Sequence, residues 1–425
     1  MPVSLKTVTL GCKVNQYETE LVRTGLLSVG YQDAAENTTA DLCVVNTCTV
    51  TQEGDAKSRQ TIRRLARENP DSRIVVMGCY ATRAPAELAA LPNVVEVVTD
   101  KREIPDLLGR FGVIDIPTGI SHFGNRQRAF VKVQDGCLLR CSYCIIPYVR
   151  PHVSSRPLAQ IAEEVARLSD NGYQEIVLTG VHLGHYGVEG NWNKPKEQWL
   201  RLSHLVRALA RLPGDFRIRL SSIEATEVTR ELLAVMAEYP DKIAPHLHLC
   251  LQSGSDAVLR RMRRRWGSRL FIDRCRLANE MLDQPAITTD IIVGFPGETD
   301  DDFAATCRVA RESGFSKIHH FSFSARKGTP AAEMKDTVPP QVKAERIRQL
   351  IELETTLTDQ FYRGLIGKRL QLLVEEVDET GPPRVRGTSC RYAPLEIAGI
   401  FPLRSLVCAT AVEVLKGRII GKFAP

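Results

Sequence analysis

Short apolar runs alternate with amphipathic stretches along most of the chain, and this alternation constrains the fold more than any other feature of the sequence. In residues 1–108 each apolar run is typical of a strand and each amphipathic stretch of a helix. Strands and helices that alternate in this way predict an open parallel sheet with helices on its faces. The strands are expected at residues 7–10, 42–45, 74–77 and 94–98, and the longer helices at residues 17–29 and 55–68.

A second series of strands and helices begins at Ala129 and predicts a partial (β/α)6 barrel. In barrels of this kind the functional residues lie at the C-terminal ends of the strands. A long amphipathic helix is expected at residues 341–363, and the short alternating strands after Gly364 predict a small β-barrel. The expected strands of the central series are residues 130–134, 175–179, 217–221, 246–251, 288–293 and 317–323.

A chain of 425 residues is too long for one ordinary hydrophobic core, so we expect an α/β protein of three domains. Residues 111–128 are rich in glycine, proline and polar side chains, which is typical of a linker. The predicted domains are residues 1–115 for the open sheet, 125–362 for the partial barrel and 364–425 for the small β-barrel.

The bulk composition favours a cytoplasmic protein that meets a polyanion. No apolar run reaches the length of a membrane span, and the N-terminus has no signal-peptide pattern, so we expect no membrane association. The twelve cysteines are then expected to be metal ligands or buried thiols rather than disulfides. The net charge of +6 arises from residues 121–425, which suits a partner such as RNA.

Cys137, Cys141 and Cys144 form a C-x3-C-x2-C triplet, with the aromatic Tyr143 just before the last cysteine. Four thiolates would hold an iron–sulfur cube as an electron carrier, whereas three leave one iron open to bind a small molecule. The alternative is a zinc site with His152 as the fourth ligand, although C-x3-C is wider than the usual C-x2-C spacing. The triplet therefore predicts a metal site, and an open iron–sulfur cluster is the favoured form.

Cys12, Cys48 and Cys79 each lie just beyond the end of an expected strand in the first domain. In a parallel sheet these strand ends share one edge, so the three residues should converge on a second open cluster. Gly11 and Gly78 remove side-chain bulk beside two of them. Six cysteines are expected to be buried thiols outside any metal site: Cys43, Cys250, Cys275, Cys307, Cys390 and Cys408.

Two cysteine trios, one on a parallel sheet and one on a partial barrel, resemble the methylthiotransferases of the radical S-adenosylmethionine (SAM) superfamily. The resemblance covers essentially the whole chain. The matching segments are residues 10–20, 46–48, 78–79, 135–147, 248–256, 290–299 and 328–330. The segments 11–20 and 219–224 resemble the branch that acts on N6-threonylcarbamoyladenosine at position 37 of tRNA. Pro151, Ala225 and Trp266 depart from the usual residues of that branch.

The resemblance implies an enzyme with two [4Fe-4S] clusters, held by Cys137, Cys141 and Cys144 and by Cys12, Cys48 and Cys79. The first cluster would reduce SAM to a 5′-deoxyadenosyl radical that removes the C2 hydrogen of adenine. The second would carry the sulfur, and another SAM would methylate it, so two SAM molecules serve each turnover. A flavodoxin- or ferredoxin-type electron donor and a sulfur donor are implied as partners. The residues expected to contact SAM are Tyr143, Gly180, Ser222, Glu224, Gln252, Ser253 and Gly294.

Arginines are the expected contacts to tRNA phosphates, because their forked guanidinium groups suit phosphate oxygens. One group lies in the basic run 260–265 and the other on the C-terminal barrel, which resembles the TRAM RNA-binding module. Glu18 and Glu20 are expected to be surface charges of the first helix, and a monomer is expected. The expected RNA contacts are Arg260, Arg264, Arg265, Arg384, Arg386 and Arg391.

Two other interpretations remain open from the sequence. The same chemistry could act on isopentenyladenosine in tRNA or on a ribosomal protein, although a ribosomal-protein enzyme should have a more acidic C-terminal barrel. A non-catalytic, metal-containing RNA-binding protein would hold zinc and would not cleave SAM. The SAM-contacting segments near Gly180, Gln252 and Gly294 argue against that second interpretation.

Overall fold

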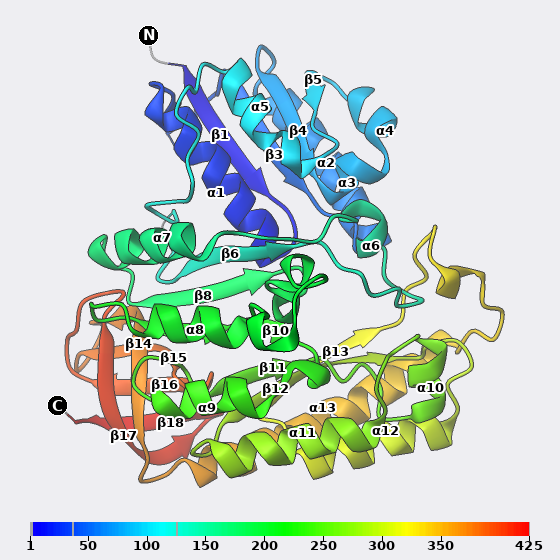
Figure 1. Cartoon of the computed structure of the whole chain (residues 1–425), viewed down its shortest axis with the longest axis vertical. Coiled ribbons are helices and arrows are strands. Elements are labelled where there is room, and N and C mark those ends of the chain that lie inside the picture. The colour runs from blue at the N-terminus through cyan, green and yellow to red at the C-terminus, as the bar shows by residue number, and fades with distance from the viewer. Residues whose placement is uncertain (1–2, 36–37, 125, 425) are drawn as a thin grey trace.

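The structure is a computed structural model that describes residues 3–35, 38–124 and 126–424. An N-terminal parallel sheet lies above a central partial barrel, and a closed C-terminal barrel packs beside the lower part (Figure 1). This arrangement confirms the α/β class expected from the sequence. Within the described ranges, no helix is both long and apolar enough to cross a membrane.

The N-terminal part is a five-stranded parallel sheet in the order β2-β1-β3-β4-β5. Its elements are β1 (Ser4–Thr9), α1 (Lys13–Ser28), β2 (Gln32–Asp33), β3 (Leu42–Thr47), α2 (Gln52–Glu68), β4 (Arg73–Gly78), α3 (Cys79–Arg83), α4 (Pro85–Ala89), β5 (Val94–Val97), the 3-10 turn η1 (Lys101–Glu103) and α5 (Ile104–Arg110). Because side chains alternate along a strand, Val44 and Met77 pack with α1 and α5, while Val45 and Val76 pack with α2, α3 and α4.

Two helices of this part begin at a cysteine or directly after one. Helix α1 starts at Lys13, directly after Cys12, and therefore earlier than the expected start at residue 17. Helix α3 starts at Cys79 and was not expected from the sequence. The strand-to-helix turns are thus very short, which keeps both cysteines at the edge of the sheet.

The central part contains two parallel sheets, β6-β8-β9 with the antiparallel edge strand β7, and β10-β11-β12-β13. A parallel bridge links Ile218 of β9 to Ile243, which lies just before β11. All six expected strands of this series are present. The elements are β6 (Ala129–Asp135), α6 (Ile146–Val149), β7 (Ser154–Ser155), α7 (Leu158–Asp170), β8 (Glu175–Gly180), η2 (Leu183–His185), η3 (Val188–Gly190), η4 (Lys196–Gln198), α8 (Leu202–Ala210), β9 (Arg217–Leu220), β10 (Ser222–Ile223), η5 (Ala225–Glu227), α9 (Arg230–Glu238), β11 (His246–Leu249), α10 (Asp256–Arg261), α11 (Ser268–Met281), β12 (Ala286–Val293), α12 (Asp300–Ser313), β13 (Lys317–Ser322), η6 (Pro330–Glu333) and α13 (Pro340–Gly364).

One large apolar core runs through the central part and reaches the N-terminal part at Tyr17 of α1. The Tyr17 hydroxyl donates a hydrogen bond of 3.0 Å to Glu164 on α7. Helix α12 shows how local sequence sets the ends of the elements: Thr299 caps its first turn together with Asp302, and Gly314 ends it in a left-handed conformation.

The C-terminal part is a closed barrel in the order β14-β15-β16-β18-β17. Its strands are β14 (Arg369–Asp378), β15 (Arg384–Ser389), β16 (Pro394–Ala398), β17 (Leu406–Leu415) and β18 (Arg418–Phe423). The sequence predicts strands at residues 369–376, 385–392 and 407–414, which correspond to β14, β15 and β17. Strands β16 and β18 were not predicted, because Pro394 and Gly421 are disfavoured in strands. The barrel has its own apolar core.

Buried arginines fasten this barrel to the central part. Arg217 donates to the carbonyl oxygens of Gln371 (2.6 Å) and Thr388 (3.0 Å), and Arg219 donates to that of Ser389 (2.9 Å). Both guanidinium groups pair with the buried Glu175. The interface therefore depends on satisfied charges as well as on apolar packing.

Candidate functional site

Three cysteines lie at the sheet edge formed by the carboxyl ends of β1, β3 and β4. Cys12 precedes α1, Cys48 follows β3, and Cys79 opens α3. Because β3 pairs in parallel with both β1 and β4, the three chain segments end side by side. All three cysteines line one pocket of about 420 Å³. Cys43 lies near the other end of β3 and is fully buried.

The glycines beside these cysteines have different roles. Gly11 has a positive φ of 106°, and a Cβ at this position would lie 3.1 Å from the Cys48 sulfur, so a side chain would crowd that thiol. Gly78 also has a positive φ, but a Cβ there would meet the Thr47 backbone 2.4 Å away. Gly78 is therefore required by the packing of β3 against β4 rather than by space beside Cys79, which corrects our interpretation of that residue.

Arg150 joins this site to the central part. Its Nε donates to the Cys79 sulfur (3.4 Å), and its two terminal nitrogens donate to both carboxylate oxygens of Glu18 (2.7 Å each). The same guanidinium reaches Asp135 (2.9 Å) at the end of β6 and the Asn15 side chain (3.1 Å). Arg150 is only 4% exposed, so these contacts are shielded from water.

Glu18 is not a surface charge, contrary to the prediction from the sequence. It is 1% exposed and lies between Arg150 and Lys132. Burial alone would raise the pKa of Glu18, but the two cations outweigh it and lower the pKa to about 2. Glu20, two residues further along the helix, is partly buried and pairs with Arg23.

The opposite wall of the cysteine pocket belongs to the central part. It includes Thr179 and Gly180 at the end of β8, and Ser221 and Ser222 after β9. The strand ends of the two α/β parts therefore face each other across this pocket. A Cβ at Gly180 would lie 3.0 Å from the Gln134 side chain, so any larger residue at this position would crowd Gln134.

Cys137, Cys141 and Cys144 lie in the loop between β6 and α6. The Cys137 amide donates to the carbonyl oxygen of Arg150 (3.4 Å), so Arg150 contacts a cysteine of each trio. Burial raises the pKa of Cys141, and it raises that of Cys144 to about 12. Both are thiols in the metal-free protein, and a metal would displace their protons on binding.

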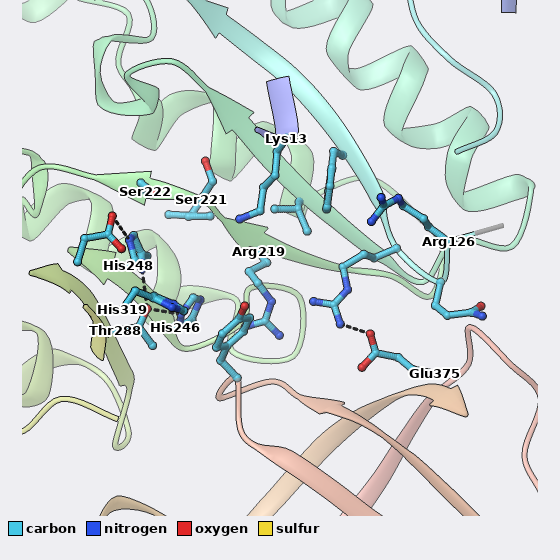
Figure 2. A pocket seen from close by; sticks show the side chains of 17 residues that line it. Lys13, Arg126, Arg219, Ser221, Ser222, His246, His248, Thr288, His319 and Glu375 are labelled. Carbon is cyan, nitrogen blue, oxygen red and sulfur yellow. Dashed lines mark hydrogen bonds and ion pairs between the residues drawn. The ribbon is translucent and has the colours of Figure 1, made fainter. Parts of the chain in front are cut away.

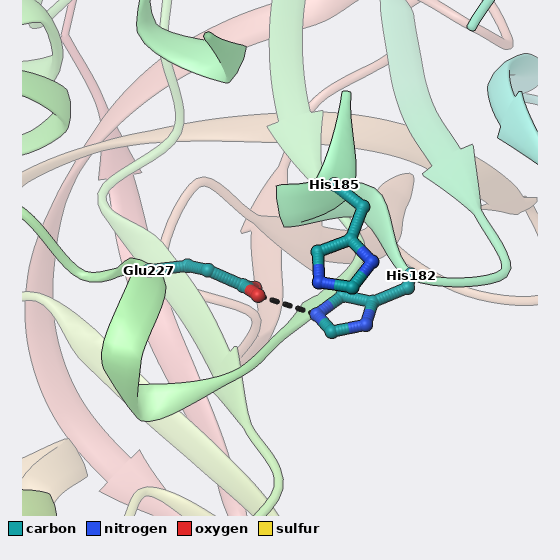
Figure 3. A group of neighbouring side chains, drawn as sticks. All are labelled: His182, His185 and Glu227. Atoms are coloured by element: carbon teal, nitrogen blue, oxygen red, sulfur yellow. Dashed lines mark hydrogen bonds and ion pairs between the residues drawn. The ribbon is translucent and has the colours of Figure 1, made fainter. Parts of the chain in front are cut away.

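A polar group beside Cys137 was not predicted from the sequence. His182 Nδ1 lies 3.7 Å from the Cys137 sulfur, and its Nε2 pairs with Glu227, while the His185 ring stacks on it at 3.6 Å (Figure 3). Burial alone would lower the pKa of His182, but its hydrogen bonds to Cys137 and Glu227 outweigh burial and raise the pKa to about 10. The only sequence signal for this group is that His182 lies two residues after Gly180, which is one of the residues expected to contact SAM.

Arg264 contacts the same trio from the other side. It donates to the Cys141 sulfur (3.4 Å), pairs with Glu224 and lies 4.9 Å from the Trp266 ring centre. The Trp266 ring nitrogen also donates to Glu224 (3.0 Å). Arg264 is therefore held inside the site and does not face solvent, so the geometry does not favour its predicted phosphate contact.

The other residues expected to contact SAM have varied surroundings. Tyr143 packs edge-on against Phe295, with ring centres 6.4 Å apart. Gln252 follows β11 in a left-handed conformation (φ 64°), while Ser253 is fully buried and lies 3.3 Å from the Thr306 hydroxyl. The amide of Gly294 donates to Glu298 (2.7 Å). Ser253 thus packs the loop after β11 against α12, and it does not line the cysteine pocket.

The predicted RNA-binding arginines differ in accessibility. Arg260 and Arg265 are exposed. Arg384 is exposed and Arg386 is partly exposed, and both pair with Glu396 on the neighbouring strand. Arg391 is buried and bonds to the Asp283 side chain and backbone, so it joins the barrel to the central part instead of facing a ligand.

Two cysteines expected to be buried thiols are partly exposed, namely Cys250 and Cys408. Cys250 lies 3.6 Å from Asp290 and near His248. In the described part of the chain, two sets of potential ligands have atoms within 4.8 Å of one another: His182 with His185 and Glu227, and His248 with Cys250 and Asp290. Neither set contains His152 or a cysteine of the two trios.

Comparisons with known proteins agree with this architecture. Residues 4–100 match the family described as uncharacterized protein family UPF0004, and residues 131–310 match the radical SAM superfamily. The fold is similar to the radical SAM methyltransferase TsrM from Kitasatospora setae, with a TM-score of 0.58 and 14% identity over 78% of this chain and 77% of that one.

Sequence relatives cover most of the chain. The threonylcarbamoyladenosine tRNA methylthiotransferase MtaB of Bacillus subtilis is 42% identical over 87% of this chain and 84% of its own. The MtaB of Thermotoga maritima is 37% identical over 87% of each chain. A tRNA-2-methylthio-N(6)-dimethylallyladenosine synthase of Mycobacterium ulcerans is 36% identical over 88% of this chain and 74% of its own. The chain therefore belongs to the radical SAM tRNA methylthiotransferases, in the branch of the threonylcarbamoyladenosine enzymes.

Proposed function

We propose that this protein transfers a methylthio group to C2 of N6-threonylcarbamoyladenosine at position 37 of tRNA. The names of the MtaB relatives support the substrate. The observation that carries the proposal is the pocket in which Cys12, Cys48 and Cys79 of the N-terminal part face Gly180 and the other strand ends of the central part. Such a pocket lets one part hold sulfur while the other holds the base.

The donor sets fit the two [4Fe-4S] clusters and the SAM that this family implies. Each site offers three soft thiolates and leaves one iron free for a ligand. When bound, these groups would supply the radical and the sulfur for replacing the C2–H bond.

The chain's own residues would position these groups. Cys137, Cys141 and Cys144 would hold the SAM-binding cluster, and Cys12, Cys48 and Cys79 the second. Arg264 and His182 would donate to the sulfurs of the first trio, and Arg150 to Cys79, which places positive charge beside anionic thiolates. Tyr143, Gly180, Ser222, Glu224, Gln252 and Gly294 remain the proposed surroundings of SAM.

Further parts of the proposal concern partners. Exposed Arg260 and Arg265 are the proposed phosphate contacts of the central part, and Arg384 and Arg386 those of the C-terminal barrel. The family resemblance supports a flavodoxin- or ferredoxin-type electron donor, a separate sulfur donor, action as a monomer and a cytoplasmic location.

Mass spectrometry of tRNA nucleosides from cells with and without the protein tests the function. Loss of the 2-methylthio derivative of threonylcarbamoyladenosine, with accumulation of its precursor, is expected. Loss of the isopentenyl derivative instead would keep the chemistry and overturn the substrate.

Variants of single cysteines test the division of labour between the two trios. With the purified, reconstituted protein, Cys141→Ala should abolish SAM cleavage. Cys48→Ala should spare SAM cleavage but block formation of the methylthio product. Cys307→Ala, which removes a buried thiol of α12 outside both trios, is the matched control. A methylthio product from Cys48→Ala would refute the role of the second trio.

A further inference from the structure

A second cavity, of about 650 Å³, adjoins the cysteine pocket inside the partial barrel. Lys13, Ser221 and Ser222 line both spaces. The cavity extends from there past β9, β11 and β12 to Glu375 and Tyr392 of the C-terminal barrel (Figure 2). We propose that this cavity binds the threonylcarbamoyl side chain of the substrate, and that Lys13 pairs with its carboxylate; this inference rests on the proposed function.

The cavity has an excess of positive charge. Its lining contains Lys13, Arg126, Arg128 and Arg219, against the carboxylates of Asp290 and Glu375. Most of these charges are already paired: Arg128 with Glu375, Arg219 with Glu175 outside the lining, and Asp290 with His248 (3.3 Å). Within the described residues, Lys13 and Arg126 form no ion pair with either carboxylate, so the cavity offers two cations to an anionic ligand.

Lys13 is the cation best placed for that anion. Its amine points into the cavity (Figure 2) and lies 5.9 Å from the centre of the Phe130 ring. It follows Cys12 directly in the chain, so it stands where the cysteine pocket opens into the cavity. Lys13 is exposed, and within the described residues its ammonium group forms no ion pair, so it is free to meet an anionic ligand that enters the cavity.

The cavity also contains polar groups for the rest of the side chain, which has an amide, a carbonyl and a hydroxyl. The Thr288 hydroxyl lies 3.0 Å from His246 Nε2 and 2.9 Å from His248 Nδ1. His246 is 4% exposed, and its Nδ1 has no hydrogen-bond partner. The Thr288 hydroxyl and the two histidine rings belong to the cavity wall, where they offer polar contacts to the rest of the side chain.

The chemistry of the base requires the two spaces to adjoin. In adenine, C2 and the carbon that carries N6 both flank ring nitrogen N1, so a reagent at C2 and a substituent on N6 lie on neighbouring sides of the ring. A base whose C2 faces the cysteine pocket would direct its N6 substituent into the adjoining cavity. An apolar isopentenyl substituent would leave Lys13 unpaired there, so the cavity should select for the threonylcarbamoyl group.

The test compares two anticodon stem-loop RNAs, one with threonylcarbamoyladenosine and one with its neutral methyl ester. Dissociation constants are measured with the purified protein by fluorescence anisotropy. Wild type should bind the carboxylate form about tenfold more tightly, the change expected for one charge-assisted contact. Lys13→Met should remove this preference without weakening binding of the ester, and Lys13→Arg should restore part of it. Lys57→Met, on the exposed surface of α2, should behave as wild type.

A labelling experiment on wild type guards against damage to the neighbouring cysteine site by the substitution. The free nucleoside threonylcarbamoyladenosine should protect Lys13 from acetylation, and adenosine should not. If Lys13→Met keeps the tenfold preference, or the nucleoside gives no protection, the assignment of the cavity is wrong. A separate activity assay distinguishes this failure from failure of the proposed function. If the wild-type protein still forms the methylthio product, only the assignment of the cavity is wrong; if it forms no such product, the proposed function is wrong as well.

Discussion

Replacing Arg150 by methionine should weaken the attachment of the N-terminal part to the central part. The guanidinium makes two bonds of 2.7 Å to Glu18 on α1 and two of 2.9 Å to Asp135 at the end of β6. Methionine fills a similar volume but carries no charge. The variant therefore leaves two carboxylates in a buried site with only Lys132 to balance them.

Breaking a buried ion pair from one side typically costs about 3–5 kcal/mol, because the remaining charge stays uncompensated. Since Lys132 continues to contact both Glu18 and Asp135, we expect a loss near the lower end, about 3 kcal/mol. With a urea m-value of roughly 2 kcal/mol per molar, the midpoint of the first unfolding transition should fall by about 1.5 M.

Urea unfolding of the metal-free protein, followed by circular dichroism, measures this change. Arg348→Met is the matched control, because Arg348 on α13 pairs with Glu345 and Glu352 at the surface, where such pairs contribute at most about 1 kcal/mol. Equal midpoints for the two variants would refute the reasoning that the Arg150 contacts hold the parts together.

Two more predictions concern buried charges. The pKa of Glu18 is about 2 in the folded protein, below the ordinary value of 4.5, so its contribution to stability is complete above pH 4.5 and is lost as the pH falls toward 2. Glu18→Gln should therefore flatten the acid side of the stability profile, measured by thermal unfolding between pH 3 and 7. Arg217→Met should loosen the C-terminal barrel, because it removes bonds to Gln371 and Thr388 and leaves Glu175 less compensated. Faster limited proteolysis at the end of α13 would show this, and an unchanged cleavage rate would contradict it.

The positions of Cys12, Cys48 and Cys79 at one sheet edge could be predicted because a parallel sheet aligns its strand ends. That inference needs only the order of strands and helices, which apolar periodicity reveals. The same reasoning located all six strands of the central part. Strands β16 and β18 were missed because their proline and glycine obscure the strand pattern.

The environments of charged side chains could not be predicted in the same way. Glu18 lies on a helix with no local sign of burial, and only the packing of α1 against β6 encloses it. Arg264 belongs to a run of arginines that is typical of a surface, yet Glu224 and Trp266, some forty residues and two residues away, hold it against Cys141. Which arginine of the run is buried depends on partners such as Glu224 that are far away in the sequence, and a single sequence does not reveal those contacts.

The contacts of Arg150 link the two cysteine trios. Its side chain donates to Cys79, and its carbonyl oxygen accepts from the amide of Cys137, so one residue contacts a cysteine from each trio. A second buried arginine, Arg326, bonds to Asp55 of α2 (2.6 Å) and links the same two parts. Hydrophobic packing is not directional, whereas charge-assisted hydrogen bonds have a preferred geometry and therefore fix the position of one part relative to the other. Chemistry that joins atoms held by different parts requires such a fixed register, because small displacements of the reacting groups lower the rate steeply.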